Sequence, residues 1–207
     1  MGAWSMYILH VSDIHCNLDA LEEVIEEHRK DVDLIAITGD ICCNSRLEKI
    51  LKRAGRRVLS VTGNMDDLHI ARILRDNNWL LDGRVEYYSS GLVVAGIGGL
   101  QPVQDLKRVI SILSSQPPRE KLLVLSHYPV HGFLDLTYSG VHAGLYELRD
   151  FIDEFKPLVF LHGHIHEARG VTRYGETLLV NPGPLAHGYY AVVEVEGDDA
   201  EAKLYKI

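Results

Sequence analysis

Short apolar runs that stop abruptly at polar residues recur along the first two thirds of the chain. The run Tyr7–Val11 ends just before Asp13 and His15, and the run Val32–Thr38 ends just before Asp40. An almost continuously apolar run of this length predicts a strand that is covered on both faces of its sheet. Polar residues directly after such strands predict a functional site at the carboxyl edge of the sheet.

Between these runs, apolar residues recur at helical spacing. Leu18–Arg29 has its apolar residues on one face, with Asn17 before it as a candidate N-cap, and a second helix is expected at Ser45–Ala54, capped by Asn44 or Ser45. Further expected helices are Asp66–Asp76, Val103–Ser115 and Val141–Phe155, and further expected strands are Arg57–Thr62, Arg84–Ser89 and Leu92–Gly96 about a Ser90-Gly91 turn, Lys121–Ser126 and Leu158–Leu161. This alternation predicts an α/β fold with helices packed on a parallel sheet.

The C-terminal end of the chain is rich in strand patterns instead. Four strands are expected there, at Gly170–Tyr174, Thr177–Val180, Tyr189–Glu196 and Ala200–Ile207. This segment has too few apolar residues for a core of its own, so we expect its strands to form a second sheet packed on the first. No internal repeat, low-complexity tract or linker interrupts the sequence, which predicts a single domain over residues 1–207.

The composition is typical of a globular protein without a basic surface. Hydrophobic residues make up 46% of the 207 residues and charged residues 24%, and the formal net charge is -8. The acidic balance disfavours nucleic acid or an anionic membrane as a partner, because sequence-blind binding to either needs a basic face. The start of the sequence does not resemble a signal peptide, and no apolar run approaches the roughly 18 residues of a membrane span, so we expect a cytoplasmic protein. The oligomeric state stays open.

Seven side chains of metal-binding type follow the predicted strands. Three offer oxygen and four offer imidazole nitrogen: Asp13, Asp40, Asn64, His15, His127, His164 and His166. This mixture suits a borderline divalent transition metal better than Mg or Ca, which prefer oxygen ligands alone. Seven ligands exceed what one ion needs if it must also hold a substrate. They suit two ions about 3.5–4 Å apart that share one carboxylate and clamp a phosphoryl group.

The order of these residues resembles the motif order of the calcineurin-like metallophosphoesterase superfamily. The five segments that match are Asp13-x-His15, Gly39-Asp40, Gly63-Asn64-x-Asp66, His127 and Gly163-His164-x-His166. Asn181-Pro182-Gly183 is similar to a turn of the small archaeal and bacterial phosphodiesterase branch. The resemblance implies a four-layer αββα sandwich, with two packed mixed β-sheets flanked by helices.

The resemblance also implies roles for the seven residues and for Asp66. One metal ion would be held by Asp13, His15 and His166, the second by Asn64, His127 and His164, and Asp40 would bridge the two. The ions would be divalent transition metals, with Mn first and Fe, Ni, Co or Zn as alternatives. A metal-bridging hydroxide would attack a small phosphate ester, with Asp40, Asn64, Asp66 and His127 as the catalytic residues. Asp66 would orient a neighbouring group or a water.

One position departs from the family pattern. The residue after Asn64 is usually a His that contacts the phosphate and assists the leaving group, but here it is Met65. A thioether cannot donate a proton, so we expect phosphodiesters with good leaving groups to be better substrates than alkyl monoesters. Two alternatives stay open: a non-catalytic metal-binding scaffold for protein interactions, and a nuclease, which the acidic balance disfavours.

Several other residues are candidates for supporting roles. His131 and His142 flank a loop that contains Tyr138 and could cover the site, although solvated loop histidines are the simpler interpretation. His162 is expected to be a packed histidine near the site, and His10 to lie in the core. The three cysteines, Cys16, Cys42 and Cys43, are expected to be small buried hydrophobic residues, with redox sensitivity or metal ligation as the alternative.

Overall fold

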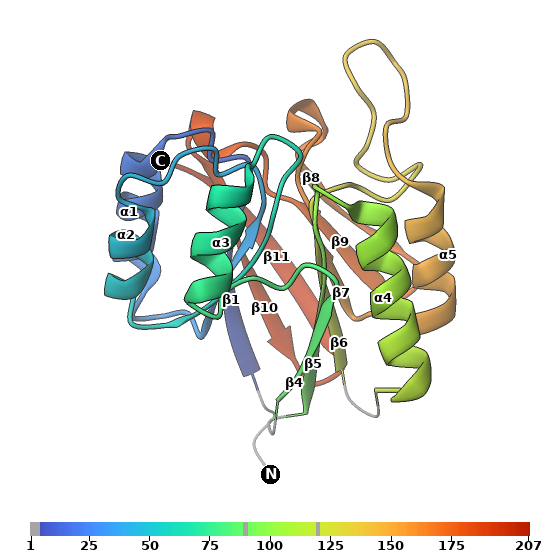
Figure 1. The fold of residues 1–207 in the computed structure, drawn as a ribbon. Helices are drawn as coiled ribbons and strands as arrows, with labels where there is room; N and C mark the ends of the chain where they lie inside the picture. Colours follow the sequence, from blue (N-terminus) through green and yellow to red (C-terminus); the bar gives the residue numbers. More distant parts are fainter. Residues whose placement is uncertain (1–4, 89–90, 119–120) are drawn as a thin grey trace.

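Two β-sheets packed face to face form the centre of the fold, and helices cover the outer face of each sheet (Figure 1). The structure, a computed structural model, describes residues 5–88, 91–118 and 121–207. The first four residues, Ser89 of an expected strand and Ser90 of an expected turn lie outside the described residues. The observed architecture confirms the predicted fold class, an α/β sandwich of two mixed sheets flanked by helices.

The first sheet has five strands in the order β11-β10-β1-β2-β3. The N-terminal strands β1 (Ser5–Val11), β2 (Leu34–Thr38) and β3 (Arg57–Val61) run parallel to one another. On the other edge of β1 lies β10 (Tyr189–Glu196), antiparallel to it, and β11 (Asp199–Lys206) completes the sheet. β1 is therefore the middle strand, and the residues that follow it lie at the centre of the sheet's edge.

The second sheet has six strands in the order β4-β5-β6-β7-β9-β8. Its strands are β4 (Arg84–Tyr88), β5 (Leu92–Ile97), β6 (Lys121–Ser126), β7 (Val159–Leu161), β8 (Gly170–Tyr174) and β9 (Thr177–Asn181). The four inner strands are parallel, and the two edge strands β4 and β8 pair antiparallel with their neighbours. The inner strands are buried on both faces, which accounts for their continuous apolar sequences.

The C-terminal strands do not form a sheet of their own, so that prediction is wrong. β8 and β9 extend the second sheet, whereas β10 and β11 extend the first. The physical reason lies in β1, which pairs with β2 on one side and has its other edge open to a partner. Such an edge exposes unpaired backbone groups. Here β10 pairs with it over six residue pairs, from Ser5 with Glu196 to His10 with Ala191.

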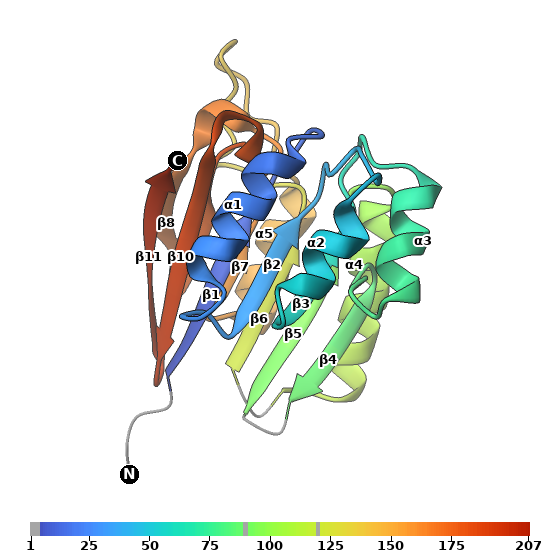
Figure 2. The same ribbon diagram turned by 90° about the vertical axis from the view of Figure 1, so that its left-hand side faces the viewer.

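Among the described residues, five α-helices cover the two sheets (Figure 2). On the first sheet lie α1 (Leu18–His28), α2 (Leu47–Arg53) and α3 (Leu68–Asp76), and on the second lie α4 (Pro102–Ser115) and α5 (Tyr146–Phe155). Within the described ranges, no helix has both the length and the apolar character that a bilayer crossing requires.

The N-cap of α1 forms as predicted, but that of α2 does not. The Asn17 side chain accepts a hydrogen bond from the Ala20 backbone N–H at 3.2 Å. α2 begins at Leu47, behind Arg46, and has no side-chain cap, so the expected caps Asn44 and Ser45 are wrong. The Leu47 N–H instead bonds to the backbone carbonyl of Asn44 at 3.3 Å, so a turn precedes this helix.

Three apolar layers separate the four layers of secondary structure. Successive residues of β1 point into different layers: Ile8 packs between the sheets, whereas Leu9 packs under the helices of the first sheet. A third layer, which includes Phe151 and Phe160, lies between the second sheet and its two helices. A strand that contributes to two apolar layers needs apolar side chains on both faces. The continuously apolar strands therefore lie in the middle of each sheet.

The helix expected at Val141–Phe155 begins five residues later, at Tyr146. The preceding segment, residues 131–145, is an irregular loop whose backbone groups bond within the loop and to the segment just before it. The Ala143 N–H donates to the carbonyl of Asp135, and the Leu145 N–H donates to the carbonyl of Pro129, both at 3.0 Å. These bonds compete with a helical first turn, so residues 141–145 stay outside α5.

Candidate metal centre

The polar ends of strands from both sheets meet on one side of the molecule, the upper side in Figures 1 and 2. Two glycines permit this approach. A Cβ on Gly63 would lie 1.9 Å from Asp40 Oδ1, and a Cβ on Gly163 would lie 1.8 Å from Ser12 Oγ. Both distances are far too short for any side chain, so the glycines before Asn64 and His164 are required for the loops to close on one another.

The backbone turns sharply where the strands end. Asp13, His15, Asp40 and His164 all have positive φ, between 42° and 70°. Non-glycine residues adopt this left-handed conformation rarely, at an energetic cost, and such residues cluster at functional sites. Here the turns aim side chains from separate strands at the same space.

The first group of ligand atoms comes from Asp13, His15 and His166. The two Nε2 atoms of His15 and His166 lie 3.2 Å apart, and His166 Nε2 lies 3.4 Å from Asp13 Oδ1. Two ligands on one tetrahedral ion with bonds of about 2.0–2.1 Å are separated by roughly 3.3 Å. Asp13 Oδ1 is also enclosed and has no hydrogen-bond partner within the described part of the chain. These three side chains therefore fit a cation.

The second group comes from Asn64, His127 and His164. His127 Nε2 lies 2.8 Å from Asn64 Oδ1 and 3.2 Å from His164 Nδ1. His127 Nδ1 lies 2.8 Å from the Thr38 carbonyl, to which it can only donate. In the neutral ring, Nε2 then carries a lone pair that faces the oxygen of Asn64. A cation bound here would satisfy both acceptors.

Asp40 lies between the two groups. Its Oδ2 atom is 4.0 Å from His15 Nε2 and 3.7 Å from His127 Nε2. Its Oδ1 atom accepts a hydrogen bond from the Met65 N–H at 2.8 Å, which fixes the carboxylate, and the side chain is almost fully buried. One carboxylate oxygen thus faces both groups, as a ligand shared by two ions would.

The electrostatics favour the protonation states that a metal needs at Asp13 and His164, but not at His166. Burial acts to raise the pKa of Asp13, but the imidazole of His166, 3.4 Å from Oδ1, and that of His127 outweigh it, so the pKa is lowered. The Asp13 carboxylate in turn raises the pKa of His166, so a metal that binds this ring competes with a proton. Burial, followed by the charge on His127, lowers the pKa of His164 to about 4. At neutral pH the site therefore combines a carboxylate anion with a neutral imidazole, both of which bind metal.

Asp66 does not join either group. Its Oδ1 accepts from the Cys42 N–H and its Oδ2 from the Gly63 N–H, both at 2.8 Å. The carboxylate therefore holds the loops that carry Asp40 and Asn64 together. Burial raises its pKa. This geometry makes Asp66 a positioning residue rather than one that touches a reacting atom.

Sequence reasoning missed a second supporting carboxylate, Asp82. It accepts hydrogen bonds from the Thr62 N–H at 2.9 Å and from the Thr62 hydroxyl at 2.6 Å, directly before Gly63. In the sequence it stands before Gly83, where it resembles an ordinary turn residue. No local signal distinguishes it, because its partner is 20 residues away.

The other histidines near the strand ends are enclosed. His162 is fully buried, its Nε2 has no hydrogen-bond partner, and burial lowers its pKa to about 4. His10 is also fully buried and bonds through Nε2 to the Thr38 hydroxyl at 2.9 Å. Burial lowers the pKa of His10 to about 3. Both histidines are therefore neutral groups packed behind the ligand residues.

The expectation that the three cysteines are small buried hydrophobic residues is wrong, because Cys16 is exposed and Cys42 and Cys43 are half-buried. Cys16 and Cys43 form a disulfide that joins the loop after β1 to the loop after β2, across 27 residues of sequence. Cys42 is free, and its Sγ lies 3.5 Å from His15 Nδ1. Burial and the surrounding carboxylates raise the Cys42 pKa to about 12, so it stays a thiol.

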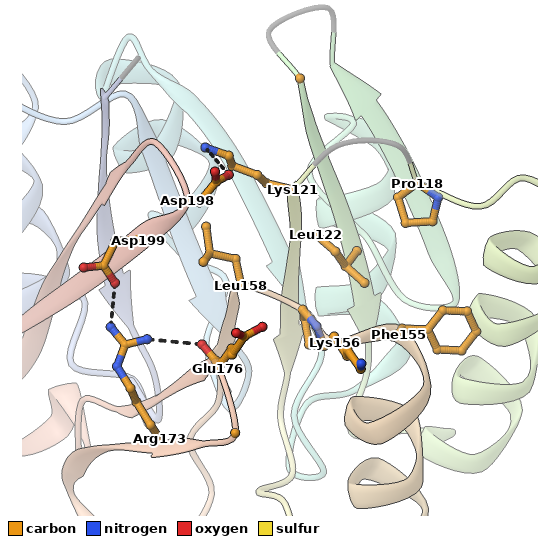
Figure 3. Close-up of a pocket in the computed structure, with 13 residues that line it drawn as sticks. Pro118, Lys121, Leu122, Phe155, Lys156, Leu158, Arg173, Glu176, Asp198 and Asp199 are labelled. Carbon is orange, nitrogen blue, oxygen red and sulfur yellow. Dashed lines mark hydrogen bonds and ion pairs between the residues drawn. The ribbon is translucent and has the colours of Figure 1, made fainter. Parts of the chain in front are cut away.

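A pocket of about 940 Å³ lies at the opposite end of the second sheet, where β6 and β7 begin (Figure 3). None of the seven ligand residues lines it. Its charges compensate one another: Arg173 pairs with Asp199 at 2.8 Å and Lys121 with Asp198 at 3.4 Å. Size alone therefore does not mark the site where the metal-binding side chains converge.

Comparison with known proteins defines the class of this chain. The sequence profile of the calcineurin-like phosphoesterase superfamily domain matches residues 6–198. The chain therefore belongs to the calcineurin-like phosphoesterase superfamily, as the motif order predicts. Together with the ligand groups, this membership makes it a metal-dependent phosphoesterase.

Individual relatives are distant. The uncharacterized protein MJ1162 of Methanocaldococcus jannaschii is 23% identical over 207 residues, covering 89% of this chain and 91% of that protein. A dimetal phosphatase from Danio rerio has 13% identity and a TM-score of 0.65, covering 97% of this chain and 99% of that one. An archaeal phosphodiesterase has 16% identity and a TM-score of 0.60, covering 98% and 100%. Structural likeness at these identities establishes the fold alone.

The first prediction concerns Asp13. Replacing Asp13→Asn removes the charge at an enclosed oxygen but keeps the shape, so metal affinity in the first group should fall roughly 100-fold or more, since even changes behind metal ligands cost 10–100-fold. After dialysis, elemental analysis should find one ion fewer per chain than in the wild type. The control is Asp31→Asn, at an exposed position. An unchanged metal content in Asp13→Asn would contradict the assignment.

The second prediction concerns the disulfide. Changing both Cys16→Ser and Cys43→Ser should lower the free energy of unfolding by about 3–4 kcal/mol, the chain-entropy value for a loop of this length. Urea unfolding in non-reducing buffer measures it. Cys42→Ser is the matched control, because that thiol is outside the disulfide. If a reductant leaves wild-type stability unchanged, the bond does not contribute as described.

Proposed function

We propose that this chain is a dinuclear metal-dependent phosphodiesterase that acts on small phosphodiesters with good leaving groups. The observation that carries the proposal is the position of Asp40, whose Oδ2 faces a ligand nitrogen of each group. A mononuclear site would have no need for the second group. A non-catalytic scaffold would have no evident need for either.

Two divalent ions, with Mn first and Fe, Ni, Co or Zn as alternatives, would polarise a phosphoryl group and lower the pKa of a bound water. Asp13, His15 and His166 would hold one ion and Asn64, His127 and His164 the other. Thr38 orients the His127 ring through its carbonyl, and Asp66 fixes the backbone on either side of the site. These supports place the ligands without help from a substrate.

Met65 supports a restricted choice of substrate. Its backbone N–H is bound to Asp40, so the residue lies beside the ligand groups, and its side chain is 62% exposed. A side chain placed there without a proton to donate cannot assist a poor leaving group. General acid help is typically worth 10²–10⁴-fold, so its absence weighs most on alkyl monoesters and least on activated diesters.

The charge balance supports a small substrate. The formal net charge of -8 disfavours a long nucleic acid as partner, since phosphate backbones are held by basic side chains. Bound divalent ions would supply positive charge locally, which suffices for a single phosphodiester group. The likeness of the fold to an archaeal phosphodiesterase is consistent with this choice but carries the fold only.

The third prediction tests the metals. Asp40→Asn should bind two ions fewer than the wild type, because the shared ligand of both groups is weakened, and should lose hydrolysis of a chromogenic diester. Removing metal from the wild type with a chelator should abolish turnover, and returning Mn²⁺ should restore it. If Asp40→Asn loses only one ion and stays active, the site is mononuclear. If no divalent metal supports turnover, the chain is a binding protein.

The fourth prediction tests the substrate class. Met65→His should raise the ratio of monoester to diester kcat/KM by about 10-fold or more, because an imidazole can protonate the leaving group. Met65→Leu, which adds no proton donor, is the control. Both variants should retain wild-type metal content, since the Met65 contact to Asp40 is made by the backbone. An unchanged ratio in Met65→His would overturn this account of Met65.

A further inference from the structure

Three metal-binding side chains that the phosphoesterase site does not use gather in the loop of residues 131–145, which rises above the sheets between β6 and α5 (Figure 1). They are His131, Asp135 and His142. One ligand atom from each lies within 4.8 Å of the other two. Two imidazoles and a carboxylate are a common set for a divalent transition metal with open positions.

Asp135 provides a fixed anion at the base of this loop. Its side chain is 1% exposed, and Oδ2 accepts hydrogen bonds from the N–H groups of Gly132 and Gly144, both at 3.0 Å. Oδ1 lies 2.7 Å from His142 Nδ1. Burial acts to raise the pKa of Asp135, but these bonds, that to His142 foremost, lower it overall. The carboxylate is therefore ionised and held in one orientation.

His131 provides an enclosed nitrogen without a partner. Its Nδ1 is buried and makes no hydrogen bond with any residue that the structure describes. Buried polar atoms almost always have a partner, and an exception calls for an explanation, such as an ion. The ring is also held in place, since its centroid lies 3.6 Å from that of Tyr146 and 5.4 Å from that of His142, with which it is stacked at 22°.

We propose that His131, Asp135 and His142 bind one further divalent transition-metal ion, separate from the ligand groups of the phosphoesterase site. The His142 side chain is 46% exposed, so an ion can enter from solvent and keep water in its open positions. On binding, the ion takes the place of the hydrogen between Asp135 and His142, which moves to His142 Nε2 where the ring is neutral and to solvent where the ring is protonated. Those two atoms then separate from 2.7 Å to roughly 3.3 Å, the spacing of tetrahedral ligands.

Such an ion would stabilise a loop that reaches the phosphoesterase site. At the tip of the loop, the Tyr138 N–H donates to Glu167 Oε1 at 2.7 Å, and Glu167 directly follows the ligand His166. Fixing the base of the loop therefore restrains a contact beside the first ligand group. The role assigned to the ion is structural, because nothing joins it to a reacting atom.

The test counts ions. Protein loaded with Co²⁺ and freed of excess metal by gel filtration should contain one ion fewer in His131→Phe than in the wild type. Phe keeps the ring that packs on Tyr146 but has no nitrogen, and His131 makes no side-chain hydrogen bond that the change could remove. His142→Gln should show the same loss. His69→Phe, at an exposed histidine of α3 outside all the ligand groups, should retain every ion.

The two sites are counted separately. In the Asp40→Asn background, His131→Phe should remove one more ion, whether or not the phosphoesterase proposal holds. If the wild type and both loop variants contain equal amounts of metal, the cluster is only a hydrogen-bonded loop and the proposal is wrong. Unchanged circular dichroism in His131→Phe establishes that a lost ion reflects lost ligation rather than unfolding.

Discussion

The arrangement of the site depends on one buried carboxylate oxygen, Asp13 Oδ1, which has no hydrogen-bond partner among the described residues and therefore needs a cation nearby. A buried charge without good hydrogen bonds costs several kilocalories per mole even after relaxation, and His166 Nε2 approaches this oxygen only to 3.4 Å. The other oxygen of Asp13 is satisfied by the His164 N–H at 3.0 Å, which needs Gly163 to pass close to Ser12. The two sheets therefore meet at a carboxylate whose second oxygen lacks a hydrogen bond. A cation in the first ligand group would satisfy that oxygen.

The second ligand group has the same deficiency in a different form. His127 is fully buried and bonded to the Thr38 carbonyl, so its remaining nitrogen faces the Asn64 oxygen with no hydrogen to share in the neutral state. Asp40 contacts both deficient regions through one oxygen. The positive φ values at the strand ends have the same explanation, because these strained turns bring the ligand side chains together.

Local pattern was enough to predict most elements and the side chains that converge, because each ligand directly follows an apolar run. It was not enough to predict how strands pair. β10 alternates Val193 and Val195 with Glu194 and Glu196. That pattern predicts a strand with one exposed face but does not decide which of the two sheets it joins. The Cys16–Cys43 bond and the Asp82 contact to Thr62 were missed for a related reason. Both join residues that only the packed loops bring together, and neither leaves a sequence motif. The late start of α5 reflects hydrogen bonds inside the 131–145 loop, which propensity alone does not reveal.

The phosphoesterase site and the loop site differ in how strongly each is destabilised without its ion. We expect this difference to decide which site binds metal more tightly. In the phosphoesterase site, acceptor faces acceptor, so the site without a cation contains repulsion that binding removes. In the loop, Asp135 already accepts three hydrogen bonds, and among the described residues the buried His131 Nδ1 lacks a partner. An ion entering the loop must first displace the proton between Asp135 and His142, so part of its binding energy is spent on that exchange. We therefore expect the loop ion to be the more weakly bound of the two, because its ligands already satisfy one another in its absence.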